Sequence, residues 1–192
     1  GFVTTAKLYG YTQVRKRYCY QAYLLESVQL PSTVTKINHY AFFSCLSLES
    51  INLPQAITII DDEAFHDCQV LVLTELPQSL TEIGAYAFAT CRKISLTEFP
   101  SETKSIGQYA FKECTGVKTL TFPAKLEKIG NAAFNQCGGL GTVTFKGTPT
   151  SIASDTFMNC TNLTTINVPW AEGAVANAPW SATNATINYN YT

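Results

Sequence analysis

Cysteine is the residue type with the clearest chemical potential in this chain of 192 residues, which contains seven. Thiolates form disulfides or bind zinc, but the C-x-x-C spacing of zinc sites is absent. Six cysteines recur at a constant interval of 23 residues, which would stack them in neighbouring coils of a repeat array. Such neighbours lie within disulfide distance, yet their parallel Cα–Cβ bonds disfavour the near-perpendicular torsion that a disulfide needs. We therefore expect one internal column of free, buried thiols, formed by Cys45, Cys68, Cys91, Cys114, Cys137 and Cys160.

The second group of chemically capable residues is acidic and consists of Asp61, Asp62, Glu63, His66 and Asp67. These side chains could ligate a metal ion, but their spacing matches neither a calcium loop nor a paired-histidine zinc site. They stand where sister segments hold glycine or tyrosine, so the sequence favours a solvated turn and implies no metal or cofactor. No nucleophile elbow, H-E-x-x-H motif or phosphate-binding loop is present in the sequence, which predicts a protein that is not an enzyme.

The charge balance argues against whole classes of partner. Thirteen basic residues meet fourteen acidic ones, for a net charge of -1, whereas nucleic-acid binders carry a basic surplus. The longest apolar runs fall far short of the roughly 18 residues of a membrane span, so we expect neither nucleic-acid binding nor membrane insertion. The basic cluster Arg15–Arg17, beside Tyr18, Tyr20 and Tyr23, imitates a nucleic-acid or anionic-lipid patch. We interpret it as the solvated rim of a cap.

The 23-residue period also appears in apolar columns. Phenylalanine stands three residues before each cysteine of the column, isoleucine stands eight before it, and an aliphatic residue stands three after it. A proline follows a large apolar residue at Pro31, Pro54, Pro77, Pro100, Pro123 and Pro169. A single 23-residue unit cannot bury these columns alone, so neighbouring units must stack. Residues 25–30 align with residues 48–53, which identifies a degenerate first repeat.

The order of residues within each unit predicts how the backbone runs around the core. Ile51 and Leu53 alternate as in a strand, and the following proline ends the hydrogen-bond ladder. The motif Ala-Phe-x-x-Cys has the i, i+1, i+4 spacing of a single helical turn. Between them lies a column predicted to be a left-handed turn, made of Asn38, Asp61, Gly84, Gly107 and Gly130. The sequence therefore predicts an α/β solenoid of 23-residue units with short parallel strands and single helical turns.

The repeated pattern L-P-x-x-x-T-x-I-G-x-x-A-F-x-x-C-x-x-L-x-x-I-x resembles the BspA-type leucine-rich repeat over about residues 30–167. It is clearest in the unit that contains Leu76-Pro77, Leu80-Thr81-Glu82-Ile83-Gly84, Ala87-Phe88, Cys91 and Ile94. The resemblance implies a leucine-rich-repeat fold and an extracellular or bacterial cell-surface location. It also implies adhesion through binding of partners. The first residues show no signal-peptide pattern, so the location rests on the resemblance.

We expect a single leucine-rich-repeat domain over residues 1–192. Residues 1–29 are predicted as a degenerate N-terminal cap, residues 30–167 as six repeat units and residues 168–192 as a C-terminal cap. Trp170 and Trp180 in the last segment are expected to cover the end of the core rather than stack on sugars. The expected function is non-catalytic binding of a protein or glycan partner. The alternative is a structural spacer module of a larger adhesin or phage-like surface protein.

The partner surface is predicted on the strands, because residues that flank an inward aliphatic residue point outward and align in rows across neighbouring coils. The candidate contacts are Leu73, Glu75, Leu96, Glu98, Thr119, Thr121, Thr142 and Thr144. Two arrangements of the leucines stay open. As an exposed pair they would anchor a partner. With Thr74 and Thr97 in the inward column, they would instead turn inward through a bulge.

Overall fold

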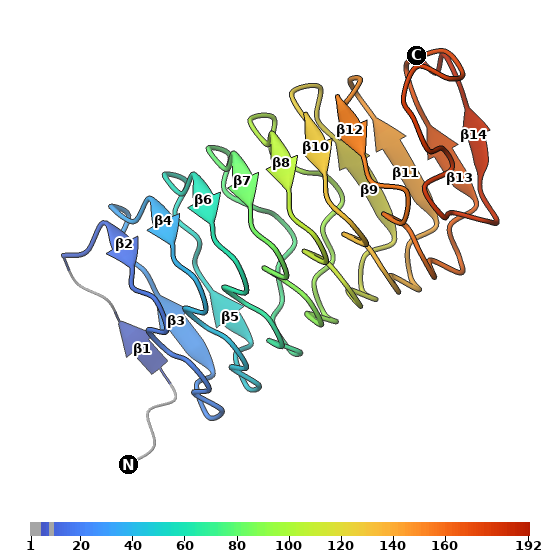
Figure 1. Cartoon of the computed structure of the whole chain (residues 1–192). Coiled ribbons are helices and arrows are strands. Elements are labelled where there is room, and N and C mark those ends of the chain that lie inside the picture. The colour runs from blue at the N-terminus through green and yellow to red at the C-terminus, as the bar shows by residue number, and fades with distance from the viewer. Residues whose placement is uncertain (1–4, 8–9) are drawn as a thin grey trace.

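The computed structural model describes residues 5–7 and 10–192. The chain winds into an elongated solenoid whose coils stack side by side, with β1 and β14 at opposite ends (Figure 1). Neighbouring strands pair in parallel, and their register follows the repeat, since Thr119 pairs with Thr142 and Thr142 pairs with Thr165. Each column of the sequence therefore becomes a ladder along the solenoid axis.

One face of the solenoid is a continuous parallel sheet of seven two-residue strands, which we call the back sheet. The second residue of each strand is buried and belongs, after the first strand, to the isoleucine column. In order along the axis the strands are β2 (Gln13–Val14), β4 (Lys36–Ile37), β6 (Ile59–Ile60), β7 (Glu82–Ile83), β8 (Ser105–Ile106), β10 (Lys128–Ile129) and β12 (Ser151–Ile152).

A second face, which we call the front sheet, has two separate parts. The N-terminal part contains β1 (Thr5–Lys7), β3 (Ser27–Gln29) and β5 (Ser50–Ile51). The C-terminal part contains β9 (Thr119–Phe122), β11 (Thr142–Phe145), β13 (Thr165–Asn167) and β14 (Thr186–Asn188). In the described chain no front-sheet strand lies between β5 and β9, where an isolated bridge joins Glu98 to Thr121.

The predicted apolar columns fill the core between the sheets. The phenylalanine column from Phe42 to Phe157 is a continuous ring stack with centroid separations of 5.1 to 5.7 Å. A second stack joins Phe99, Phe122 and Phe145 behind the front sheet. Full burial of one such side chain contributes about 1.5–3 kcal/mol, and each aromatic pair adds about 0.5–1.5 kcal/mol. Stacking of coils therefore supplies the stability that one repeat lacks.

The predicted helical turn is wrong, because the described residues contain no helix. Ala87, Phe88 and Cys91 are buried as expected, but Tyr86 and Thr90 have left-handed φ values of 55° and 61°, which a helix does not tolerate. The N–H groups of Tyr86, Phe88 and Thr90 donate to the next coil at 2.7 to 2.9 Å, whereas those of Ala87 and Cys91 donate to carbonyls three residues back. Consecutive turns thus replace the helix, and the fold is a parallel-strand β-solenoid rather than an α/β solenoid.

The predicted position of the left-handed turn is also wrong. Positive φ occurs two residues after the predicted column, at Tyr40, Glu63, Tyr86, Tyr109 and Ala132. The glycines are needed for a different reason, the close approach of coils. A Cβ atom at Gly107 would lie 2.5 Å from the backbone nitrogen of Ala85 in the preceding coil, and Gly84 and Gly130 are equally confined.

The two ends of the array differ. At the N-terminal end β1 pairs with β3 and β2 pairs with β4, so the described residues continue both sheets. At the C-terminal end β14 pairs with β13, and Trp170 and Trp180 are buried. Neither indole offers a ring face to a sugar, which supports the end-covering interpretation. The boundaries 1–29, 30–167 and 168–192 stay a prediction, and residues 1–4 and 8–9 lie outside the described part.

Candidate functional site

Two rows of outward-facing polar side chains run along the C-terminal part of the front sheet. Thr119 and Thr121 of β9 lie in register with Thr142 and Thr144 of β11, and the residue between the two threonines of each strand is buried. The rows continue at Thr165, Asn167, Thr186 and Asn188. The four candidate threonines therefore share one uncharged surface that can donate and accept hydrogen bonds, and their role in binding stays a prediction.

Side-chain amides join the rows near the C-terminal end. Asn167 donates from Nδ2 to Oγ1 of Thr144 at 3.2 Å, and Asn188 donates from Nδ2 to Oδ1 of Asn167 at 2.8 Å. Asn167 itself is buried. Because these groups already bond to each other, a partner would gain little from replacing those bonds. The accessible part of the rows is therefore the end at β9.

Leu73 and Leu96 are buried, with exposed fractions of 7% and 1%, while Thr74 and Thr97 are exposed. Of the two arrangements that the sequence left open, the structure has the inward one, so the leucines do not form an exposed anchor. The reason is hydrophobic. In these two coils the aliphatic residue stands one position earlier than in β5 or β9, and burying leucine is favourable by about 1.5–3 kcal/mol.

The inward leucines interrupt the front sheet. In β9 the inward residues Leu120 and Phe122 are two positions apart, as an extended strand requires. In the coil after β5 the buried residues Leu73 and Leu76 are three positions apart, which a regular strand cannot place on one face. The chain bends between them, and the strand is lost.

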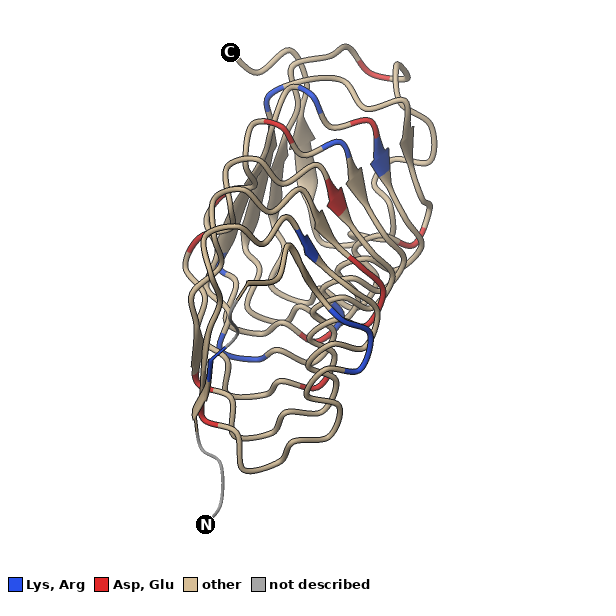
Figure 2. Ribbon diagram, turned by 90° about the vertical axis from the view of Figure 1, so that its left-hand side faces the viewer, with Lys and Arg blue, Asp and Glu red and all other residues tan. Residues whose placement is uncertain are grey.

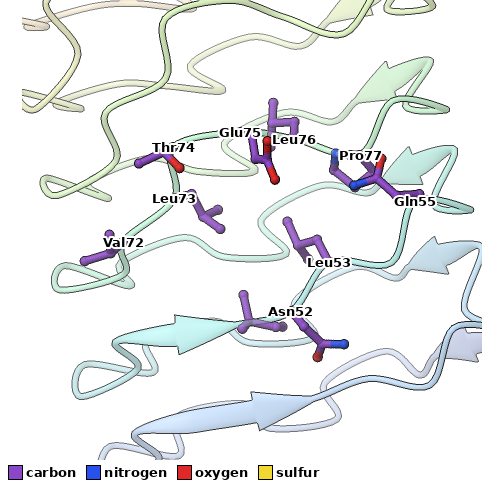
Figure 3. Close-up of a pocket in the computed structure, with 10 residues that line it drawn as sticks. Asn52, Leu53, Gln55, Val72, Leu73, Thr74, Glu75, Leu76 and Pro77 are labelled. Atoms are coloured by element: carbon purple, nitrogen blue, oxygen red, sulfur yellow. The ribbon is translucent and has the colours of Figure 1, made fainter.

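The bend opens a groove between two coils, which we call the front groove. It has a volume of about 340 Å³ and is lined by residues 51–53, 55 and 72–77. Leu53 and Leu73 point into the space between the coils, and Glu75 and Gln55 lie toward its proline end (Figure 3). An adjoining recess of about 170 Å³ shares residues 74–76 and extends along residues 97–100. Glu75 and Glu98, two of the candidate contacts, therefore line one connected depression.

Backbone groups without partners line the front groove. The N–H groups of residues 73–76 and the carbonyls of Ile51 and Leu53 have no hydrogen-bond partner within the described residues, although the matching groups of β9 and β11 pair in register. A sheet edge of this kind is a template for an added extended segment. The front groove thus combines open main-chain donors and acceptors with leucine side chains and the Glu75 carboxylate.

The acidic group singled out in the sequence is divided among separate contacts. Asp61 pairs with Lys36 at 2.9 Å. Glu63 accepts a hydrogen bond from the Tyr40 hydroxyl at 2.8 Å and lies 3.1 Å from Nδ1 of His66. That hydrogen bond raises the pKa of Tyr40. In the part of the chain that the structure describes, no three such side chains are placed to hold one metal ion.

The predicted column of free, buried cysteines is confirmed. The thiol of Cys91 donates to the carbonyl of Phe65, in a coil before it, at 3.0 Å. The same contact recurs at 3.0 to 3.1 Å for Cys45, Cys68, Cys114, Cys137 and Cys160. Burial raises the pKa of Cys91 and Cys114. Protonated thiols in an apolar column are poor nucleophiles and poor metal ligands, so the column is structural.

A family model described as the BspA-type leucine-rich repeat region matches residues 12–99 and 81–178, with six copies. The two matches together span most of the chain. The chain belongs to the BspA-type leucine-rich repeat family. A search of curated proteins found no match.

Solved structures of bacterial leucine-rich repeat proteins are similar to this BspA-type chain. A leucine-rich repeat protein of Treponema pallidum is 26% identical, with a TM-score of 0.73 over 85% of this chain and 79% of that one. A leucine-rich cell surface protein of Faecalibacterium prausnitzii is 26% identical, with a TM-score of 0.78 over 88% of this chain and 48% of that one. This chain therefore spans about half of the second protein. The pneumococcal vaccine antigen PcpA, at 16% identity and a TM-score of 0.55, shares the fold.

The sequence did not identify the front groove of this BspA-type protein. Its lining includes Asn52, Gln55 and Pro77, none of which is among the candidate contacts. The available signal was the exchange of Ser-Ile, as at Ser50-Ile51, for Leu-Thr in two consecutive units. In the described residues no helix has the length and apolarity needed to cross a membrane.

Proposed function

We propose that this BspA-type domain is a non-catalytic binding module that holds an extended segment of a protein partner in the front groove. The single observation that carries the proposal is the break in the front sheet between β5 and β9, where backbone groups stand open beside the groove. A peptide main chain supplies the donors and acceptors that these groups lack.

The side chains around the front groove suggest the chemistry of the bound segment. Leu53 and Leu73 favour an aliphatic side chain, and the exposed Glu75 favours a lysine or arginine beside it. The threonine rows of β9 and β11 extend the surface with neutral hydrogen-bonding groups. A volume of about 340 Å³ suits a few residues, so the remaining affinity would come from the rows.

We also propose that the domain acts outside the cell, at the bacterial surface, in adhesion. The support is membership of the BspA-type family and similarity to a protein described as a leucine-rich cell surface protein. A glycan partner is the other binding candidate. A structural spacer is the competing role, favoured by the uninterrupted back sheet that runs through seven coils.

The experiment compares the wild-type chain with a closed variant, Leu73→Ser with Thr74→Ile, which restores the Ser-Ile order of β5. Both proteins are immobilised, and a displayed library of random heptapeptides is selected on each. We expect the wild type to enrich peptides with a basic residue beside an aliphatic one, and the closed variant to lose them. Glu75→Gln should weaken the selected peptides by about tenfold, whereas Glu82→Gln on the back sheet serves as the matched control and should not. Equal enrichment on wild type and closed variant would support the spacer.

A further inference from the structure

Charge is distributed unevenly along the solenoid axis, on which Figure 2 marks Lys and Arg in blue and Asp and Glu in red. The first 25 residues contain four basic side chains, Lys7, Arg15, Lys16 and Arg17, and no acidic one. The rest of the chain contains nine basic and fourteen acidic residues, for a net charge of -5. The near-neutral total therefore conceals a basic N-terminal coil joined to an acidic array, and such asymmetry indicates a local anionic partner.

The described basic side chains divide into those that take part in ion pairs and those that take part in none, which include Lys93, Lys104, Lys118 and Lys128. Lys36, Arg92, Lys112, Lys125 and Lys146 all take part in ion pairs with acidic residues. Arg15, Lys16 and Arg17 are exposed and belong to no ion pair within the described residues. Their charge is thus available to a ligand.

Tyrosine rings hold the two guanidinium groups in place. The Arg15 guanidinium carbon lies 5.0 Å from the Tyr11 ring centroid, and that of Arg17 lies 5.1 Å from Tyr20 and 5.6 Å from Tyr40. A guanidinium stacked on a ring keeps its N–H edge free for bidentate contact with a carboxylate or sulfate. Stacking therefore lowers the entropy cost of binding an anion.

Exposed aromatic surface surrounds these cations. Four tyrosines, each 37% to 48% exposed, gather in this coil as Tyr11, Tyr18, Tyr20 and Tyr23. A small recess of about 90 Å³ is lined by Tyr11, Gln13, Arg15 and Tyr18. Flat tyrosine rings offer an apolar face and a polar hydroxyl, which suits the apolar face and the hydroxyl rim of a sugar ring. The amide of Gln13 adds a further hydrogen-bonding group.

We propose that this N-terminal coil binds an acidic oligosaccharide through its sulfate or carboxylate groups, with Arg15 and Arg17 contacting the anions and the tyrosines contacting the sugar rings. The site is separate from the front groove and does not depend on it. The small extent of the patch distinguishes its ligand from a long polyanion. Beyond residue 25 the array carries a balance of -5, so a nucleic acid running along the solenoid would be repelled.

The test measures binding of a sulfated glycosaminoglycan tetrasaccharide to the full chain by calorimetry, with its desulfated, N-acetylated and carboxyl-reduced counterpart as the neutral probe. We expect the sulfated probe to bind and the neutral probe to bind at least about tenfold more weakly. The variant Arg15→Gln/Arg17→Gln should lose about tenfold in affinity. The matched control Lys93→Gln/Lys104→Gln, which removes the same charge elsewhere, should stay within about twofold because distant surface charges contribute little.

Tyr11→Ser tests the aromatic half of the site and should weaken the sulfated probe while leaving the melting temperature unchanged, since Tyr11 is exposed. A single-stranded oligonucleotide and anionic phosphatidylserine vesicles form two further arms. The proposal is overturned if either binds more tightly than the tetrasaccharide, if the control variant loses as much affinity as the arginine variant, or if no sulfated probe binds. Self-association of the chain that the arginine variant abolishes would also overturn it, because a second copy would then be the occupant.

Discussion

At the scale of the residue, each cysteine of the internal column fills space and satisfies a carbonyl. The Sγ of Cys114 donates to the carbonyl of Phe88 at 3.1 Å, and the side chain is fully buried. A serine at this position would keep the hydrogen bond but bury a more polar atom, whereas alanine would leave the carbonyl without its donor. Cysteine suits the column because it is apolar enough for the core and still a weak donor.

The buried thiols predict a stability that falls with alkaline pH. Burial raises the pKa of Cys91 and Cys114, whereas the pKa of a cysteine thiol in an unfolded chain is about 8.5. Above that pH the unfolded chain loses protons that the native chain keeps, so the free energy of unfolding decreases by about 1.4 kcal/mol per pH unit for each such thiol. Below about pH 8 the contribution is complete and constant.

Denaturant titrations at pH 7, 8, 9 and 9.5 measure this slope. The control is Cys91→Ala/Cys114→Ala, which should be less stable at pH 7 but show a shallower decline with pH. A wild-type free energy of unfolding that stays constant across this range would show that the thiols are accessible or bridged.

At the scale of the element, the break in the front sheet follows from the order of two residues. Exchange of Ser50-Ile51 for Leu73-Thr74 moves the aliphatic side chain by one position, and burial of that side chain outweighs continuation of the strand. The proline that ends the segment and the buried Leu76 stay in their columns. The inward turn of Leu73 is therefore accommodated by a local bend of the backbone, and the rest of the coil keeps its register.

The break predicts a difference in amide hydrogen exchange. Amides of residues 73–76, which lack partners within the described chain, should exchange much faster than those of β11, which pairs with β9 on one side and with β13 on the other. In the closed variant, Leu73→Ser with Thr74→Ile, these amides should become protected, because the aliphatic residue returns to the column of Ile51. The readout is mass spectrometry of peptides that cover residues 70–78. Slow exchange in the wild-type protein would mean that the front sheet is continuous in solution.

At the scale of the whole molecule, stability is shared between neighbours, so the two ends are its weakest points. At the C-terminal end Trp180 is fully buried and its ring lies 6.2 Å from Phe145 and 6.4 Å from Trp170. Its Nε1 donates to the carbonyl of Ala176 at 2.8 Å, and its own carbonyl accepts from Phe157. The indole of Trp180 thus ends the aromatic packing, and the backbone carbonyl of Trp180 ends the ladder of hydrogen bonds between coils.

Removal of this indole should destabilise the end of the array. Trp180→Ala should cost about 3–5 kcal/mol, the range for truncation of a large buried aromatic side chain. Trp180→Phe should cost less, because it retains ring packing and loses one hydrogen bond. Thermal melting followed by far-ultraviolet circular dichroism gives the loss, and sedimentation tests whether the uncovered end associates. An unchanged melting temperature in Trp180→Ala would mean that the indole is not the cover of the core.

The sequence by itself determined the period, the parallel stacking and the identity of the core columns. Six phenylalanines and six cysteines at one interval cannot be buried within single units, so physics leaves stacking of coils as the solution. It also placed the threonine rows, because alternation in a strand depends on position alone.

Only the tertiary structure decided the conformation of the turns and the existence of the front groove. The spacing in Ala87, Phe88 and Cys91 buries the same side chains in a helical turn or in consecutive turns, and the choice depends on N–H groups that bond to the next coil. The path of the chain at Leu73 and Thr74 also depends on the neighbouring coil. Turning Leu73 inward breaks strand hydrogen bonds, and the partners in those bonds belong to that coil. Local pattern fixes which side chains are buried, whereas pairing between coils fixes the backbone path that buries them.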